Sequence, residues 1–171
     1  MGSAAKVENV KCGVLLRHRH CVGESNYHLQ FTPNFRGRVF LPSSVRMLCR
    51  QLFYQKAAEL GVALLAAEFG PDHCHIFVGN CRKYSVSQLA QFFKGYTSRI
   101  IRQQLWPVVS EYVWGKHFWS EGYFYESVGR VTADSVKFYI ERQQGKHWKH
   151  EDFEMEFAKQ AGRQSSLGSF F

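Results

Sequence analysis

The chain has 171 residues, enough to bury a substantial core in one domain and too few for two comfortable ones. Hydrophobic residues make up 45% of the sequence and aromatic residues 16%, which excludes an intrinsically disordered chain. The net charge of +8 favours a polyanionic partner, with nucleic acid first and an anionic membrane surface second.

The first half of the chain predicts a strand, a helix and a strand pair. SNYHLQFTP alternates and is rich in aromatic residues, which predicts a strand over about residues 25–32, and NFRGRVF then forms a basic loop or a short return strand. Apolar residues at helical spacing predict a helix from about Ser44 to Leu60, opened by serines suited to capping and ended by Gly61. VALLAAEFG and HCHIFVGN, joined by a Gly-Pro-Asp turn, predict two adjacent strands in a hairpin.

The second half predicts two more helices and one more strand region. SVSQLAQFFKGYTSRIIRQQL carries apolar residues at helical intervals behind a suitable cap, and HFWSEGYFYESVG predicts an aromatic strand or hairpin. TADSVKFYIERQQG predicts a third helix that begins after Thr132 and ends at Gly145. This order favours an α+β fold, an antiparallel β-sheet with helices packed on one face.

We expect three parts along the chain: an N-terminal arm or extra strand over residues 1–24, a domain over 25–145, and a partly flexible extension over 146–171. No apolar run approaches the roughly 18 residues of a membrane span. MGSAAKVENVKCG lacks the apolar core of a secretory signal, and the five cysteines form no CxxC pair, so we expect reduced thiols in a cytoplasmic protein.

His73 and His75 are the first candidate site residues. At positions i and i+2 of a strand they share one face, with Cα atoms about 6.5–7 Å apart. Two imidazoles at this spacing can share one metal, each nitrogen about 2.0–2.2 Å from it. Cys74 points to the opposite face and is expected to pack in the core, while Asp72 is a possible partner for a ligating imidazole. Alone the H-x-H pattern is weak, and two partly exposed histidines without a ligand remain the alternative.

Tyr139 and Gln143 are the second candidates. They are four residues apart on the third predicted helix, so they share one face about one turn apart. The apolar stripe of Val136, Phe138 and Ile140 only partly includes Tyr139, which leaves its phenol free to face a site. Taken alone, a surface tyrosine with a packed ring and a hydrated hydroxyl is the favoured interpretation, since the chain has 8 tyrosines.

Taken together, these motifs resemble the HUH nucleases, and within them the single-tyrosine transposases of the insertion-sequence 200/605 group. The resemblance runs from about Asn26 to Gln143 and includes YHLQFTPNFRGRVF, AEFGPDHCHIFV, LAQFFKGYTSRII, WGKHFWSEGYFYESVG and VKFYIERQ in the family's order. The sequence departs from the family at Cys74, where a bulky hydrophobic residue is usual, and neither the N-terminal arm nor the tail after Gly145 has a counterpart. The resemblance implies a ferredoxin-like (RRM-like) HUH endonuclease fold with the tyrosine on a C-terminal helix.

The resemblance also implies the chemistry. Tyr139 would be the nucleophile, and His73, His75 and Gln143 would be the protein ligands of a divalent metal, Mg²⁺ or Mn²⁺. The implied enzyme is a transposase that cleaves and rejoins single-stranded DNA at the ends of an insertion sequence through a 5′-phosphotyrosine intermediate. One phosphodiester is exchanged for another, so no ATP is needed, and the sequence has no GxxxxGK[ST] phosphate-binding loop.

The implied partners are single-stranded DNA with subterminal hairpins and a second copy of the chain. In the homodimer, the tyrosine helix of one chain would complete the histidine pair of the other, giving composite active sites. The expected location is the cytoplasm, in association with the nucleoid. Basic residues near aromatic rings are expected to supply some of the DNA contacts as a set, although for any single one a solvated charge is the favoured interpretation: Arg36, Arg38, Lys94, Arg99 and Arg102.

Several interpretations stay open. The same chemistry could serve a domesticated nuclease of palindromic repeats or a nickase of the replication or relaxase type, and a remote alternative is a non-catalytic nucleic-acid-binding module. Cys12, His18, His20 and Cys21 suggest zinc, but their spacing matches no common structural site, which favours an arm or added strand. The four tryptophans are expected in the core or at interfaces: Trp106, Trp114, Trp119 and Trp148.

Overall fold

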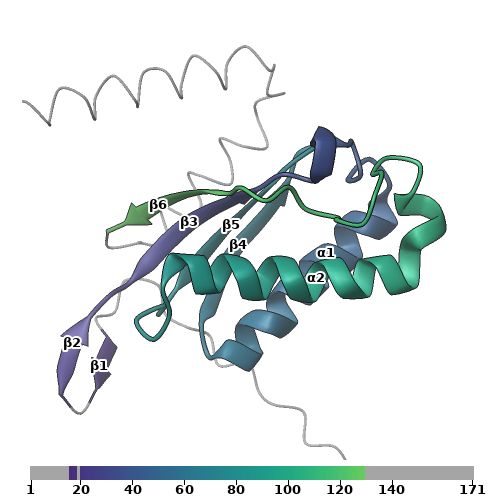
Figure 1. The fold of residues 1–171 in the computed structure, drawn as a ribbon. Helices are drawn as coiled ribbons and strands as arrows, with labels where there is room; N and C mark the ends of the chain where they lie inside the picture. The colour runs from purple at the N-terminus through teal and green to yellow at the C-terminus, as the bar shows by residue number, and fades with distance from the viewer. Residues whose placement is uncertain (1–15, 19, 130–171) are drawn as a thin grey trace, which may run out of the picture. The chain divides into compact units, whose positions relative to one another are not determined.

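The computed structural model describes residues 16–18 and 20–129. Their main element is a four-stranded antiparallel sheet with the strand order β4-β5-β3-β6, drawn in Figure 1. In chain order its strands are β3 (Asn26–Phe31), β4 (Ala63–Phe69), β5 (Cys74–Gly79) and β6 (Phe124–Val128). The first predicted strand and the predicted β4–β5 hairpin are confirmed, and the aromatic segment forms the single strand β6, which pairs with β3.

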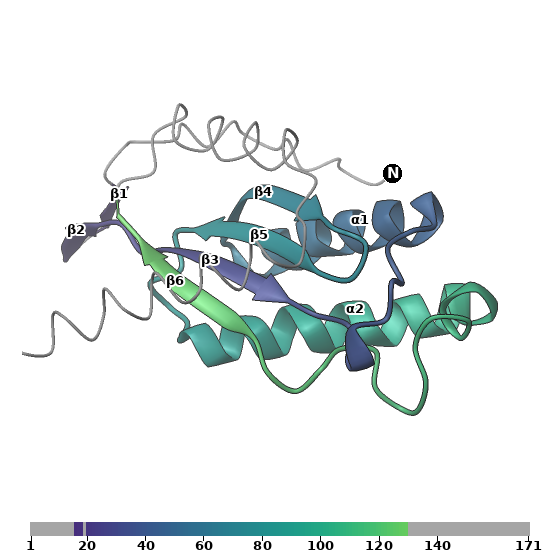
Figure 2. The ribbon, with the colours of Figure 1, turned by 90° about the horizontal axis from the view of Figure 1, so that it is seen from above.

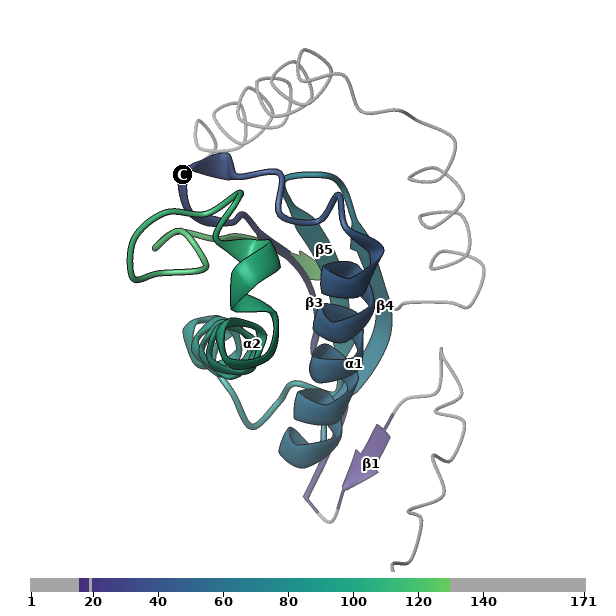
Figure 3. The same cartoon turned by 90° about the vertical axis from the view of Figure 1, so that its right-hand side faces the viewer.

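Two long helices, α1 (Ser43–Leu60) and α2 (Val86–Val109), cover one face of this sheet. Figures 2 and 3 show both helices on the same side of the strands, with α1 and α2 beside each other. The predicted class, an antiparallel sheet with helices on one face, is therefore confirmed. The opposite face of the sheet carries the histidines that are described below.

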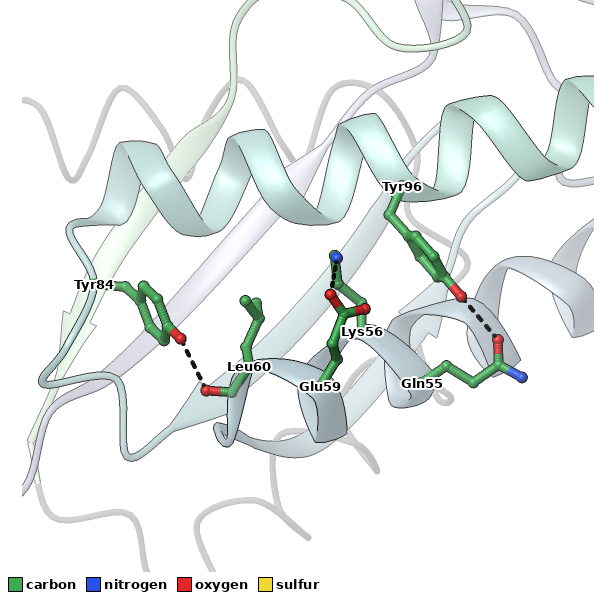
Figure 4. Close-up of polar contacts among 6 residues, drawn as sticks. All are labelled: Gln55, Lys56, Glu59, Leu60, Tyr84 and Tyr96. Atoms are coloured by element: carbon green, nitrogen blue, oxygen red, sulfur yellow. Dashed lines mark hydrogen bonds and ion pairs between the residues drawn. The ribbon is translucent and has the colours of Figure 1, made fainter. Parts of the chain in front are cut away.

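Polar contacts fix the two helices against each other. In Figure 4 the Tyr84 hydroxyl, just before α2, donates to the carbonyl oxygen of Leu60 at 3.1 Å, and the Tyr96 hydroxyl donates to Oε1 of Gln55 at 3.4 Å. The ammonium of Lys56 lies 4.8 Å from the centre of the Tyr96 ring. The Tyr84 contact connects the start of α2 to the end of α1. The Tyr96 contacts connect the middle of α2 to α1, so the two helices are held together at two points along their length.

The side chains of β3 and β5 alternate between the two faces of the sheet, as strand geometry requires. The fully buried side chains under the helices are Leu29, Phe31, Cys74, Ile76 and Val78. The residues between them, on the opposite face, are His28, Gln30, His75 and Phe77. The prediction that Cys74 packs in the core is confirmed, and its thiol is free.

Two of the four ends of α1 and α2 follow the prediction, while α2 continues to Val109, past the predicted end at Leu105. Ser85 caps α2 in a capping box, because its hydroxyl accepts from the Gln88 backbone N–H while the Gln88 side chain accepts from the Ser85 N–H. Gly61 ends α1 with a left-handed φ of 69°. The expectation of a serine cap for α1 is wrong: Ser43 already lies inside the helix, and the N-cap is Pro42, which makes no side-chain cap hydrogen bond.

Two short elements complete the described residues. β1 (Leu16–His18) and β2 (Cys21–Gly23) pair with each other as an antiparallel ladder. η1 (Asn34–Arg36) is a single 3-10 turn in the basic segment after β3, so this segment is a loop rather than a return strand.

Part of the expected architecture lies outside the described residues. The third predicted helix, with Tyr139 and Gln143, is one such part, and Cys12 and Trp148 are others. The helix, and the choice between a zinc site and an arm, therefore stay predictions. Where the structure is described, no helix combines the length and the apolar character that crossing a membrane requires.

Candidate active site

The histidine pair, His73 and His75, lies where the turn after β4 enters β5. The backbone N–H of Gly70 donates to the carbonyl oxygen of His73 at 2.9 Å and closes this turn. A Cβ atom at Gly70 would lie 2.3 Å from Cε1 of the His73 ring, far inside van der Waals contact. The ring of His73 therefore packs directly on the glycine backbone, and the Gly-Pro-Asp turn gives the first imidazole its place.

Asp72 orients the ring of His73. Its Oδ1 accepts a hydrogen bond from Nδ1 of His73 at 2.8 Å, and its Oδ2 lies 3.5 Å from Nε of Arg36. The hydrogen bond from His73 lowers the pKa of the Asp72 carboxyl, against the opposing effect of partial burial, and the charge of Arg36 acts in the same direction. With Nδ1 of His73 held by a carboxylate, Nε2 is the nitrogen that this ring can offer to a metal.

His75 is held by a residue that sequence analysis did not single out. Its Nδ1 lies 2.9 Å from Nε2 of His28, on the neighbouring strand β3. The His28 ring is in turn stacked on Phe77, with centroids 4.7 Å apart and planes at 6°. His28 and Gln30 stand at strand spacing in YHLQF, which could have marked them as one face. Only the register, in which Gln30 pairs with His75 and His28 with Phe77, shows that this face meets the histidine pair.

Burial keeps these two imidazoles uncharged. His75 has only 5% of its surface exposed and His28 only 7%. Burial lowers the pKa of His28 to about 4. Burial also lowers the pKa of His75 well below its ordinary value, with smaller contributions from the neighbouring rings of His28 and His73. A neutral imidazole is the form that binds a metal.

The arrangement fits a shared metal ion. The ring centroids of His73 and His75 are 5.1 Å apart, with the planes nearly perpendicular at 86°, and each Nδ1 already has a partner. An ion would therefore be held through the Nε2 atoms of both rings. Within the described residues no group of three or more His, Cys, Asp or Glu side chains is placed to hold a metal. The amide of Gln143, which lies outside the described residues, is the further protein ligand that the family resemblance implies.

Two exposed aromatic rings lie beside each other, Phe35 from the loop after β3 and Trp114 from the segment after α2, and we call them the aromatic pair. Phe35 is 69% exposed and Trp114 is 68% exposed, and their ring centroids are 6.4 Å apart. The loop is fixed to the segment around Trp114, because the Asn34 N–H donates to the carbonyl oxygen of Phe118 at 2.9 Å and a Cβ at Gly37 would clash with the backbone of Tyr112.

The backbone of this loop is strained. Phe35 and Arg36 are consecutive non-glycine residues with φ values of 55° and 52°, in the left-handed region. The strain turns the Phe35 ring to solvent while the Arg36 side chain reaches Asp72. The loop thus connects the aromatic pair to the carboxylate that holds His73. Strained residues of this kind cluster at functional sites.

The predicted basic residues differ in their surroundings. Arg38 and Arg99 are exposed, and the Arg102 guanidinium lies 4.4 Å from the ring centre of Trp106. Lys94 instead donates to the carbonyl oxygens of Glu121 and Gly122, at 2.8 and 3.2 Å, so it anchors the loop before β6.

The described tryptophans differ in burial. Trp119 is buried, as expected, and its Nε1 donates to the Thr97 hydroxyl at 2.9 Å. Trp106 and Trp114 are exposed, so the core placement is wrong for these two, and an interface role for them stays a prediction.

Comparisons with known proteins show which family the chain belongs to. The family model of the IS200-like transposases matches residues 21–143. The transposase for insertion sequence element IS200 of Salmonella typhimurium is 30% identical over 127 residues, which are 72% of this chain and 80% of that protein. The ISDra2 transposase TnpA of Deinococcus radiodurans is 26% identical over 128 residues, 75% of this chain and 90% of that protein.

A solved structure supports the fold. The crystal structure of a Deinococcus radiodurans protein assigned as a transposase superposes with a TM-score of 0.60 at 24% identity, covering 75% of this chain and 98% of that one. The family match extends from β2 through the segment that contains Tyr139 and Gln143. The chain belongs to the family of IS200-like transposases, enzymes that cleave DNA and transfer its strands.

Proposed function

We propose that this protein moves an insertion sequence by cleaving and rejoining single-stranded DNA at its ends, through a 5′-phosphotyrosine intermediate formed on Tyr139. A divalent cation, Mg²⁺ or Mn²⁺, would be held by His73, His75 and Gln143. The observation that carries the proposal is the histidine pair itself. Two adjacent imidazoles each have Nδ1 held by a partner, so Nε2 is the nitrogen through which each ring would bind a metal.

The bond changes balance without a co-reactant. The Tyr139 oxygen forms a bond to phosphorus as its proton is lost, and the bond between phosphorus and the 3′-oxygen breaks. The electron pair goes to that oxygen, which takes up a proton and becomes a free 3′-hydroxyl. The reverse attack by a 3′-hydroxyl rejoins a strand and releases the tyrosine, since one phosphodiester has been exchanged for another of similar energy.

The histidine site suits an anionic substrate. A bound divalent cation would offset the negative charge of the scissile phosphate and orient it. His73 and His75 are ligands without negative charge, so they leave the charge of such an ion available to the phosphate. A tyrosine phenol ordinarily has a pKa of about 10, so the attacking oxygen needs its proton removed or its developing charge stabilised.

The aromatic pair supports a single-stranded substrate. Unpaired bases can stack on exposed rings, and each such contact contributes about 1–3 kcal/mol to binding. Arg36 and Arg38 stand in the same loop, where their charges can contact phosphates. Arg36 of this loop contacts Asp72, which holds His73, so a strand bound to the loop would lie close to the proposed metal site. The expected substrate is single-stranded DNA with subterminal hairpins.

The proposal includes a homodimer with composite active sites. Within the described part of the sheet, β4 and β6 are the edge strands, and the three central residues of β6 are exposed. An edge strand with open backbone groups can pair with a second copy of the chain. The tyrosine helix of one subunit would then complete the histidine pair of the other.

A strand-transfer assay tests the proposed function. The element's two ends would be supplied as labelled single-stranded DNA and, separately, as duplex, with Mn²⁺ or Mg²⁺. We expect joined products from the single strand alone, and none after a chelator is added. Cleavage without joining would instead indicate a nickase, and binding without cleavage would indicate a nucleic-acid-binding module.

A further inference from the structure

We infer that His28 is a positioning residue of the histidine site: its Nε2 accepts a hydrogen bond from Nδ1–H of His75 and so directs Nε2 of His75 to the metal. This inference rests on the proposed function, because it concerns the same metal site. It assigns a role to a side chain on β3, the strand next to the one that carries the ligand.

The contact is built by the sheet. In the β3–β5 register His28 pairs with Phe77 and Gln30 pairs with His75, so His28 is the diagonal neighbour of His75 on the same face. Diagonal neighbours in antiparallel sheets are about 7–8 Å apart at their Cα atoms, which two imidazoles can bridge. The Nε2 of His28 and the Nδ1 of His75 are 2.9 Å apart, a full hydrogen bond between buried rings.

Ring packing fixes the His28 side chain. It is stacked almost parallel on Phe77, with an angle of 6° between the planes, and the edge contact with Phe124 has centroids 5.9 Å apart at 68°. Phe77 comes from β5 and Phe124 from β6, so strands on both sides of β3 contact the ring. A ring held in this way presents its nitrogen at a set position, as an orienting partner must.

The tautomers make this hydrogen bond directional. When His75 offers the lone pair of Nε2 to a metal, its proton is on Nδ1, and this N–H must donate to Nε2 of His28. In the opposite tautomer His28 donates to His75, and the proton of His75 then occupies the nitrogen that a metal needs. His28 supports the site when it carries its own proton on Nδ1 and accepts with Nε2.

The two ligands are therefore supported differently. Nδ1 of His73 donates to the carboxylate of Asp72, whereas Nδ1 of His75 has a neutral imidazole as its partner. A neutral acceptor orients the ring without adding a negative charge beside the ion. This keeps more of the cation's charge for the phosphate than a second carboxylate would.

Two substitutions separate the hydrogen bond from packing. His28→Phe keeps a ring that can stack on Phe77 but removes the acceptor, and His28→Gln places an amide oxygen near the position of Nε2. The full-length variants would be titrated with Mn²⁺ by calorimetry and by electron paramagnetic resonance, with thermal melts as the check on folding. We expect His28→Phe to weaken Mn²⁺ binding by about 10–100-fold, the usual effect of losing such a partner, and His28→Gln to restore a large part of it.

The inference is overturned if folded His28→Phe binds Mn²⁺ as tightly as the wild type, or if the Phe and Gln variants lose affinity equally. His75→Ala is the reference that separates the two proposals. If the wild type and His75→Ala bind Mn²⁺ alike, the metal site of the proposed function is refuted, and the role of His28 with it. If His75→Ala loses the metal and His28→Phe does not, only the role of His28 is refuted.

The tautomer provides a second readout. Nitrogen NMR of the His75 ring, recorded with diamagnetic Mg²⁺, reports which nitrogen carries the proton. We expect the proton on Nδ1 in the wild type and in His28→Gln, and a shift toward Nε2 in His28→Phe. A wild-type His75 protonated on Nε2 in the presence of saturating Mg²⁺ contradicts the inference.

Discussion

The ring of His73 occupies the space in which a side chain of residue 70 would lie. A Cβ atom there would be 2.3 Å from Cε1, 2.7 Å from Nε2 and 2.8 Å from Nδ1 of the ring. The affected group is a side chain that can rotate, so a substitution would displace the imidazole rather than break the turn. The site therefore requires glycine at position 70, because any side chain there would displace the His73 ring.

Gly70→Ala should therefore lose metal binding while the protein stays folded. The methyl group forces the His73 ring away from Asp72 and from His75, and we expect Mn²⁺ affinity to fall at least as far as for a lost orienting partner, about 10-fold or more. Gly122→Ala is the matched control, because a Cβ there meets nothing within 4 Å. Calorimetric titration with Mn²⁺ and a thermal melt would measure both effects. Unchanged affinity in Gly70→Ala would show that the ring position does not matter.

At the scale of elements, the loop after β3 places an aromatic ring in solvent at the expense of backbone strain. Phe35 has φ 55° and ψ 22°, a conformation that costs most residues about 1–2 kcal/mol and that asparagine tolerates better. Its ring buries little surface in return, being 69% exposed. Such a residue contributes little to the stability of the fold, and its exposure fits the DNA contact that we propose for the aromatic pair.

Phe35→Asn should separate binding from stability. We expect the free energy of unfolding to stay equal or rise slightly, because the strain is relieved, while binding of single-stranded DNA weakens by about 1–3 kcal/mol through the lost stacking. Fluorescence anisotropy with labelled DNA and chemical denaturation measure the two quantities. Met47→Ala serves as the control, since Met47 is 70% exposed on α1 and lies outside the loop. Equal DNA binding by wild type and Phe35→Asn would remove the aromatic pair from the interface.

The elements differ in how far the sequence determines them. Local sequence patterns that agree with the tertiary packing predict three features correctly. These are the β4–β5 strands, the Ser85 cap of α2 and the burial of the Cys74 side chain in the core. The start of α1 does not, because Pro42 with its fixed φ can precede a helix without the serine hydroxyls. The contact of His28 with His75 depends on strand register, and the exposure of Trp114 depends on loop packing. Both bring together residues far apart in sequence, so local patterns do not reveal them.

The candidate site was only partly predictable for the same reason. Strand spacing puts His73 and His75 on one face, and adjacency adds Asp72, since all three lie within one turn and strand. The pattern is weak alone, and the resemblance to the family is what gives the two histidines a role as metal ligands. Cross-strand partners such as His28 need the β3–β5 pairing. The roles of Tyr139 and Gln143 come from resemblance to the family, and their placement beside the histidines stays a prediction.

At the scale of the whole molecule, activity should depend on two chains. If the tyrosine helix acts on the partner's histidine pair, a mixture of Tyr139→Phe and His75→Ala proteins contains dimers in which one site has both an intact tyrosine and intact histidines. We expect each variant alone to be inactive and the mixture, after subunit exchange, to regain strand transfer at a fraction of the wild-type rate. A mixture with no activity, although heterodimers form, would place tyrosine and histidines of one site in the same chain.

The most direct test of the central claim is the covalent intermediate itself. Wild type, Tyr139→Phe and His75→Ala would each be incubated with labelled single-stranded DNA carrying the element's ends and Mn²⁺ or Mg²⁺, then separated on a denaturing gel. We predict a slow, protease-sensitive DNA–protein adduct with the wild type only, abolished by a chelator, with the label retained when it lies on the 3′ side of the cut. An adduct that persists in Tyr139→Phe, or cleavage of the correct ends with no adduct at all, would contradict a phosphotyrosine transposase built on this histidine pair.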